Sequence, residues 1–146
     1  MPADFRPPLR VLHVFGAMVL VGWALDITLL KSVAPGYRSM QANTAICFML
    51  LGVALWLSGR GAIETRGPAA ASVCASMVVV IAALTLAQDL LGLDFGIDQA
   101  LFREAPAPDS VEAPGRMAHA TAAGFIILGL AQLLSRHRRG RFHAVA

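Results

Sequence analysis

Residues 69–93 read AAASVCASMVVVIAALTLAQDLLGL, with Asp89 as the only charge. This stretch exceeds the roughly 20 residues that a helix needs to cross the hydrocarbon core of a bilayer. Three further apolar stretches lie at 11–30, 43–57 and 117–134. Backbone groups in lipid must pair internally, so we expect each stretch to be a helix. The sequence therefore predicts an all-α fold, an integral membrane four-helix bundle that forms one domain over residues 1–146.

The composition excludes an ordinary soluble domain. The chain of 146 residues is 57% hydrophobic and only 14% charged, whereas soluble domains contain about 25% charged residues. A soluble domain of this size has too little interior to bury so much apolar surface. Disordered chains are poor in apolar residues, so disorder is excluded as well. The two cysteines, Cys47 and Cys74, are too few for a disulfide scaffold.

The basic residues predict the orientation in the membrane. Loops are expected at 31–42, 58–68 and 94–116, where Pro and Gly interrupt the apolar runs. With both termini inside, the cytoplasmic side carries eight arginines: Arg6, Arg10, Arg60, Arg66, Arg136, Arg138, Arg139 and Arg141. The outer side then carries four basic residues: Lys31, Arg38, Arg103 and Arg116. This asymmetry predicts a multi-pass protein of the bacterial inner membrane with both termini cytoplasmic.

The net charge of +3 reflects the excess of basic residues on the predicted cytoplasmic side of the membrane. It does not indicate a nucleic-acid partner. The tail at 135–146 concentrates four arginines between Arg136 and Arg141. Such a segment beside the cytoplasmic leaflet attracts anionic lipid by roughly 1 kcal/mol per charge. We therefore expect the tail to bind anionic lipid of the inner leaflet.

An internal repeat relates the two halves of the chain. Residues 40–58 and 117–135, a shift of 77 residues, agree at nine of nineteen positions. Both predicted helices run inward, so the chain reads as two parallel-repeat hairpins. One alignment of the other two helices sets Asp26 against Asp89, and another sets Asp26 against Asp98. The shared Gly52 and Gly129 are expected at the internal seam between the two halves.

Pairs of small residues four positions apart are expected where helices pack closely. These pairs are Ala71/Ala75, Ala118/Ala122 and Ala120/Gly124.

Several of these residues together resemble a known membrane region. They are the stretch WALDI at 23–27, the stretch SMQANTA at 39–45, the stretch LDFGIDQALF at 93–102 and the triplet GRM at 115–117. Their order resembles the four-helix N-terminal membrane sensory region of bacterial sensor histidine kinases and related signalling proteins, over about 11–135. Members of that family continue into effector domains, whereas only twelve residues follow Leu134 here. The resemblance therefore implies an input module that acts through a separate partner.

Six residues are candidates for a ligand site near the outer ends of the helices: Asp26, Asn43, Asp89, Asp98, Arg116 and His119. Ionisable groups within a span are costly and indicate function by default. The alternative for Asp26 and Asp89 is structural, with these acids paired to Arg116, Arg38 or Lys31 or solvated at the interface. Asn43 is also placed to cap the second helix. His119 stands where the family pattern leads us to expect a Pro-Asn-like pair, which puts an inherited role there in doubt.

The segment at 94–116 allows two interpretations. Its aromatic and aliphatic side chains suit a short helix lying in the membrane interface. They equally suit a lid over an outward-facing pocket between helices.

Two histidines within spans raise the question of haem. His13 lies near the inner end of the first span and His119 near the outer end of the fourth. At 1.5 Å per residue they are roughly 20 Å or more apart along the membrane normal, too far to share one iron. Axial ligation of haem or a pigment by one of them stays open, but we expect no cofactor and no metal.

The sequence contains no nucleophile–base pair, zinc spacing or phosphate loop, so we expect no enzyme. The first hypothesis is a sensory or ligand-binding membrane module with a protein partner. The alternative is an accessory or structural subunit of a larger respiratory or photosynthetic membrane complex, in contact with pigment or lipid.

Overall fold

The computed structural model describes residues 6–32, 39–59, 67–103 and 115–143, with the side chains of 6–10 and 136–143 outside the description. The helices are α1 (Arg6–Ala24), the single turn α2 (Thr28–Lys31), α3 (Ala42–Gly59), α4 (Gly67–Leu91) and α5 (His119–His143). A 3-10 turn, η2 (Ile97–Gln99), follows α4. None of the described residues forms a strand. The predicted all-α class is therefore confirmed.

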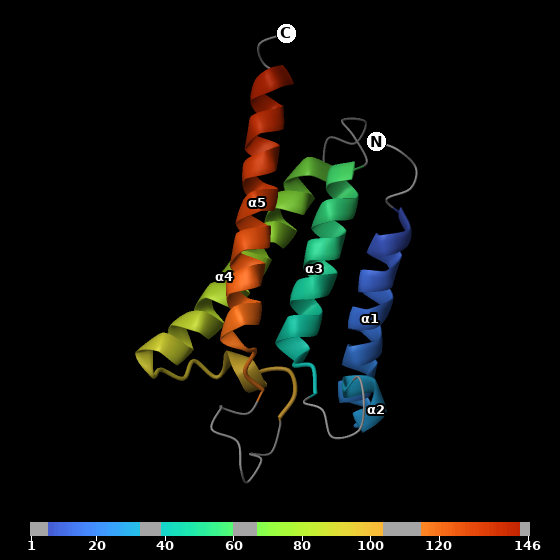
Figure 1. The fold of residues 1–146 in the computed structure, drawn as a ribbon, viewed down its shortest axis with the longest axis vertical. Coiled ribbons are helices and arrows are strands. Elements are labelled where there is room, and N and C mark those ends of the chain that lie inside the picture. Colours follow the sequence, from blue (N-terminus) through green and yellow to red (C-terminus); the bar gives the residue numbers. More distant parts are fainter. Residues whose placement is uncertain (1–5, 33–38, 60–66, 104–114, 144–146) are drawn as a thin grey trace.

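The four long helices run alternately down and up, so the start of α1 and the end of α5 lie at the same end of the described part of the chain (Figure 1). α1 packs against α3, α3 against α4 and α4 against α5. α3 and α5 meet over a narrower contact. The opposite end, where α1 and α4 finish and α3 and α5 begin, carries α2 and η2 (Figure 1). We call it the η2 end.

The prediction of one uninterrupted helix over 11–30 was wrong. α1 ends at Ala24, and the chain turns before α2 begins at Thr28. Asp26 adopts a left-handed conformation with φ of 54°, and the amide of Ile27 donates to the carbonyl of Gly22 over 2.8 Å. This pattern is a Schellman helix end, and Asp is one of the few non-glycine residues that tolerate the left-handed position.

The other boundaries differ less. α3 extends the predicted stretch at 43–57 by one residue at its start and two at its end. α4 begins two residues before the predicted stretch at 69–93 and ends two residues before it does. α5 begins at His119 and continues to His143, through most of the segment predicted as a separate tail. The lipid-binding role predicted for Arg136, Arg138, Arg139 and Arg141 falls on side chains outside the described ones.

Within the described residues, two helices are long and apolar enough to cross a membrane. They are α3, with mean hydropathy 1.7, and α4, with mean hydropathy 2.3 over its best window. Two shorter apolar helical stretches are Val11–Ala24 and His119–Ser135.

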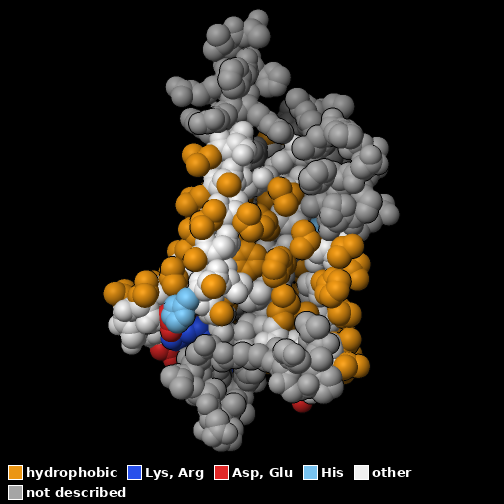
Figure 2. All heavy atoms as spheres, viewed as in Figure 1, with side chains coloured by type: hydrophobic (Ala, Val, Ile, Leu, Met, Phe, Trp, Pro, Cys, Tyr) orange, Lys and Arg blue, Asp and Glu red, His pale blue; other side chains and the backbone are white. Residues whose placement is uncertain are grey.

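α4 has a face of small residues and a face of large ones. The packed face consists mainly of Ala71, Ala75, Val78, Ala82 and Thr85. The opposite face exposes Val73, Met77, Val80 and Leu84. On the face shown in Figure 2, apolar side chains also cover the other helices, and the charged side chains that are coloured there lie near the η2 end. The buried Ala71 and Ala75 confirm one predicted small-residue contact, whereas a Cβ on Gly124 would meet nothing within 4 Å.

The repeat is visible in the helix contacts, and α1 and α4 correspond at a different shift from α3 and α5. A Cβ on Gly52 would lie 2.8 Å from Cε1 of His13 in α1, and one on Gly129 would lie 2.6 Å from Cγ2 of Val79 in α4. The two glycines are 77 residues apart, and His13 and Val79 are 66 apart. Both glycines therefore mark contacts inside a hairpin, and not the seam between the halves.

The helix ends support the same shift of 66. The amide of Leu93 donates to the carbonyl of Gln88 over 2.9 Å, and Gly92 has φ of 64°. This repeats the turn at Asp26 and Ile27 66 residues later. Asp26 therefore corresponds to Gly92. The two sequence alignments, which set Asp26 against Asp89 or against Asp98, do not describe how α1 and α4 correspond.

Candidate functional site

The segment after α4 runs back across the η2 end. The amide of Phe95 donates to Oε1 of Gln88 over 2.8 Å, which fixes the segment to the last turns of α4. Asn43 of α3 donates from Nδ2 to the carbonyl of Ile97 over 3.3 Å. The ring of Phe102 lies 5.8 Å from that of Trp23 in α1. The described part of the segment, residues 94–103, thus contacts the ends of α4, α3 and α1, and we call it the lid segment.

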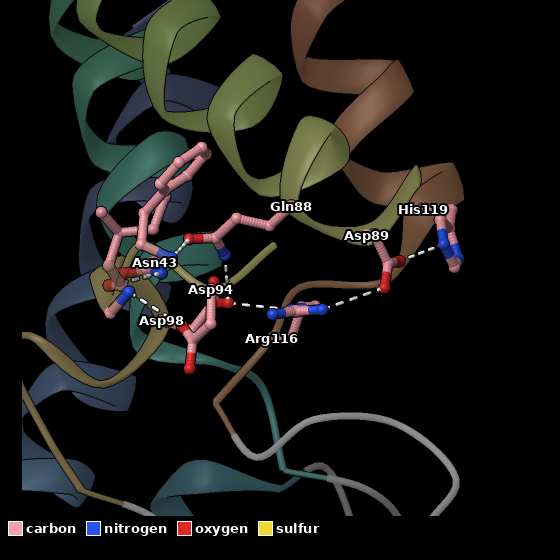
Figure 3. Close-up of polar contacts among 10 residues, drawn as sticks. Asn43, Gln88, Asp89, Asp94, Asp98, Arg116 and His119 are labelled. Atoms are coloured by element: carbon pink, nitrogen blue, oxygen red, sulfur yellow. Dashed lines mark hydrogen bonds and ion pairs between the residues drawn. The ribbon is translucent and has the colours of Figure 1, made fainter. Parts of the chain in front are cut away.

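Arg116 connects this segment to α4. Its Nε donates to Oδ2 of Asp98 over 2.9 Å, and its Nη1 donates to Oδ1 of Asp89 over 3.2 Å. Nε2 of Gln88 donates to the same Asp98 oxygen over 2.6 Å. The other oxygen of Asp89 pairs with Nε2 of His119, the first residue of α5. Figure 3 shows this chain of contacts from the lid segment through Arg116 to α5.

The centre of this network is buried. Gln88 is fully buried, and the side chains of Asp98 and Arg116 are 5% and 13% exposed. Exposure rises outward to 24% at Asp89 and 58% at His119. A buried carboxylate is stable only when it is paired and hydrogen-bonded, and here one arginine serves two acids. Among the described residues, Oδ1 of Asp98 has no hydrogen-bond partner.

Gly115 lets the chain reach this position. Its φ is 76°, a left-handed conformation that favours glycine. A Cβ at Gly115 would lie 2.5 Å from the carbonyl oxygen of Asp98. The backbone before Arg116 can therefore touch the lid segment only where a side chain is missing.

The acids determine the protonation of Arg116. Desolvation is the largest influence and lowers its pKa, but the hydrogen bonds and charges of Asp98 and Asp89 outweigh it, so the pKa is raised above its ordinary value. The guanidinium is therefore a permanent cation between two carboxylates.

The structure brings five of the six predicted site residues together. Asp89, Asp98, Arg116 and His119 form one chain of contacts, and Asn43 holds the backbone next to Asp98. Asn43 lies within the first turn of α3, and its described bond is to Ile97, so the capping interpretation was wrong.

Asp26 is not part of this network. Its described ion pair is with Lys31 over 2.5 Å, and its side chain is 92% exposed. The hydrogen bond and the charge of Lys31 lower the pKa of Asp26. The ammonium of Lys31 also lies 4.6 Å from the ring centre of Trp23. This pair stabilises the turn between α1 and α2.

Sequence reasoning did not select Gln88 as a site residue. Its position as a polar residue beside Asp89 in an apolar run was the available signal. The two histidines have separate neighbours, since His13 packs against Gly52 and His119 pairs with Asp89.

A cavity of about 280 Å³ lies beside Arg116, between the beginnings of α3 and α5. Gln41, Thr44 and Phe48 line it on one side, and Arg116 and Thr121 on the other. The rings of Phe48 and Phe125 meet edge to face with centres 4.9 Å apart, where the two helices approach.

No known family model, curated protein or solved structure matches this chain.

Proposed function

We propose that this chain is a non-enzymatic sensory or ligand-binding module of the bacterial inner membrane. Its site is at the η2 end, facing outward, and it acts through a separate protein partner. The observation that carries the proposal is the half-buried Arg116, which pairs with Asp89 of α4 and Asp98 of the lid segment beside a cavity, while Asp89 also pairs with the start of α5. A molecule bound there changes the contacts of both hairpins at once.

The distribution of side chains supports the membrane setting. Only 28% of the most apolar window of α4 is buried inside the protein, and its buried face is largely alanine. A soluble protein would bury its large apolar residues. Helices that pack in lipid instead bring small residues together and leave large ones outward.

The test is gentle detergent extraction of the tagged protein followed by native mass spectrometry. We expect a small assembly that carries a bound small molecule. Asp98→Asn should reduce the occupancy at least tenfold, because it removes the charge that pairs with Arg116. Asp26→Asn is the matched control, the same change outside the network, and should retain full occupancy. Equal occupancy in the two variants would contradict a site at Arg116.

The exposed apolar stripe of α1 favours the second candidate function, that of an accessory subunit. Val11, Val14, Phe15 and Met18 are exposed, spaced along one face of a helix that packs mainly on α3. Such a face suits lipid or a larger membrane complex. Stoichiometric recovery of the chain with a large complex in the same extraction would support this candidate and contradict the proposal of a free-standing module.

A further inference from the structure

The two halves of the repeat meet mainly where α4 packs on α3. Cys47 and Leu51 of α3 lie in one hydrophobic cluster with Val78 and Ala82 of α4. α3 therefore has a neighbour on each side, α1 of its own hairpin and α4 of the other (Figure 1). Its counterpart α5 packs mainly on α4, and among the described residues α1 makes no contact of this extent with α4 or α5. The contact between α3 and α4 thus has no equivalent between α5 and α1 of the same chain.

The residues of α5 that correspond to the α4-facing side of α3 are uncovered. Three pairs correspond in this way at the shift of 77: Cys47 and Gly124, Leu51 and Leu128, Ala54 and Ala131. The three α3 residues are buried, Leu51 at 6% exposed. On α5, Leu128 is 51% exposed, Ala131 is exposed, and a Cβ on Gly124 would meet nothing within 4 Å.

A fourth pair shows the same difference. Leu50 of α3 packs against the hydrophobic cluster, whereas its counterpart Ile127 is exposed. We call Gly124, Ile127, Leu128 and Ala131 the open face of α5. Because the matching face of α3 is covered by a helix of the other hairpin, a helix equivalent to α4 fits the open face as well.

α1 is the helix equivalent to α4, and one of its exposed residues has a packed counterpart. At the shift of 66, Phe15 corresponds to Ile81, which packs against the hydrophobic cluster. Phe15 is 57% exposed. The other exposed residues of its stripe have counterparts that α4 exposes too: Val11 and Met77, Val14 and Val80, Met18 and Leu84. The repeat thus assigns Phe15 to a helix contact and the rest of the stripe to the surroundings of the protein.

The directions of the helices suit a contact between two copies. α3 and α4 run in opposite directions, and so do α5 and α1 (Figure 1). α1 of a second copy in the same orientation therefore lies antiparallel to α5, with the η2 ends of the two copies level. Gly124 and Ala131 leave room for a close approach of the two helices, as small residues do at helix interfaces in lipid.

We propose that α1 of a second copy of this chain docks on the open face of α5 and repeats there the packing of α4 on α3. Phe15 of the second copy takes the role of Ile81, and Ile127 takes the role of Leu50. The contact joins two different faces, so copies connected in this way form a closed ring or an open row. The inference concerns α1 and α5 and does not depend on a ligand at Arg116.

The experiment is cysteine cross-linking between two tagged forms of the full chain, one with Phe15→Cys and one with Ile127→Cys. Both forms are expressed in the same cells, and their isolated membranes are oxidised. We expect a dimer that contains both tags. The chain without added cysteines gives the background from Cys47 and Cys74.

The matched control replaces Ile127→Cys by Val80→Cys. Val80 is exposed like Ile127 and lies next to Ile81, but it is on the outward face of α4. We expect at least ten times less dimer with Phe15→Cys in this pairing. A chain that carries both Phe15→Cys and Ile127→Cys should give a ladder of multimers.

The variant Gly124→Phe tests the open face without a cross-link. Its side chain meets nothing within the chain itself, so the helical circular dichroism should be unchanged, but it fills the space that α1 of the second copy needs. We expect native mass spectrometry to find single copies. Ala83→Phe is the control, a small-to-large change at an exposed position whose counterpart Ala17 is exposed too, and should keep the assembly.

Three results would overturn the inference. In the first, the doubly substituted chain gives mainly an internal cross-link, because its own α1 then occupies the open face. In the second, each single-cysteine form cross-links to itself as well as the mixture does, since that indicates a symmetric contact. In the third, Ile127→Cys is recovered attached to a different protein, or Gly124→Phe keeps both the assembly and the cross-link.

Discussion

At the scale of single residues, the second half of the repeat carries chemistry that the first half lacks. Trp23 and Asp89 correspond at the shift of 66. Trp23 donates from its indole to the carbonyl of Met40 over 2.8 Å, while Asp89 pairs with Arg116 and His119. Trp23 connects the end of α1 to the residues just before α3, and Asp89 connects the end of α4 to the start of α5. The first half thus makes this connection through an indole–carbonyl hydrogen bond, whereas the second half makes it through charged side chains.

Arg116→Gln should therefore lower the free energy of unfolding because it removes a charge, and not because it changes the packing. It leaves the nearly buried Asp98 without its cation, and breaking a buried ion pair costs about 3 kcal/mol or more. We expect a clear fall in the thermal midpoint in nanodiscs. Arg103→Gln, at an exposed position, is the control and should leave the midpoint unchanged. A fall of the same size in both variants would rule out the burial argument.

Asp26 should behave as a turn residue. Asp26→Gly loses an exposed ion pair but relieves the left-handed backbone, so stability should hold or rise slightly. Since Lys31 lowers the pKa of Asp26, the pair stabilises the turn above the ordinary Asp pKa of about 3.9 and is lost as the pH falls through the lowered value. Unfolding of Asp26→Gly should thus lose a small part of its acid sensitivity. A large loss of stability at neutral pH would show that Asp26 has a further role.

At the scale of helices, two glycines of α5 make opposite predictions. A Cβ on Gly129 would lie 2.6 Å from Val79 and 3.2 Å from the carbonyl oxygen of Ala75, so Gly129→Ala must push α5 away from α4. We expect a loss of about 1–3 kcal/mol. Gly124→Ala meets nothing within 4 Å and should be neutral or slightly stabilising, because alanine favours helix. Unfolding of the two variants in one detergent checks the difference, and equal behaviour would refute the α4–α5 contact.

The sequence predicted the helices better than their ends. Length and hydropathy sufficed for α3 and α4, where apolar residues run without a break. They failed at Asp26, because a left-handed turn at Asp leaves no gap in hydropathy. The repeat was readable in α3 and α5, where close packing preserves Phe48, Phe125 and the paired glycines. α1 and α4 could not be aligned from the sequence, since their ends carry different side chains at equivalent backbone positions.

At the scale of the whole molecule, most of the candidate site was predictable because charged residues are rare in this chain. Few basic residues were available to pair with Asp89, so Arg116 was among the proposed partners, but its pairing with Asp98 was not predicted. Gln88 and Gln41 were not predicted, since an uncharged amide gains its role from burial, which only the packed helices reveal. The cavity itself depends on how α3 and α5 meet, a contact between segments 77 residues apart.

The central claim is that this chain spans the inner membrane with the Arg116 network at the outer face. Cysteine labelling in intact cells with a membrane-impermeant maleimide tests it most directly. The probe sites are Arg103→Cys at the η2 end and Ser135→Cys near the opposite end of α5, both exposed, with the unmodified chain as the blank. We predict that Arg103→Cys is labelled in intact cells and Ser135→Cys only after permeabilisation. The reverse pattern, or release of the protein into the soluble fraction, would contradict the claim.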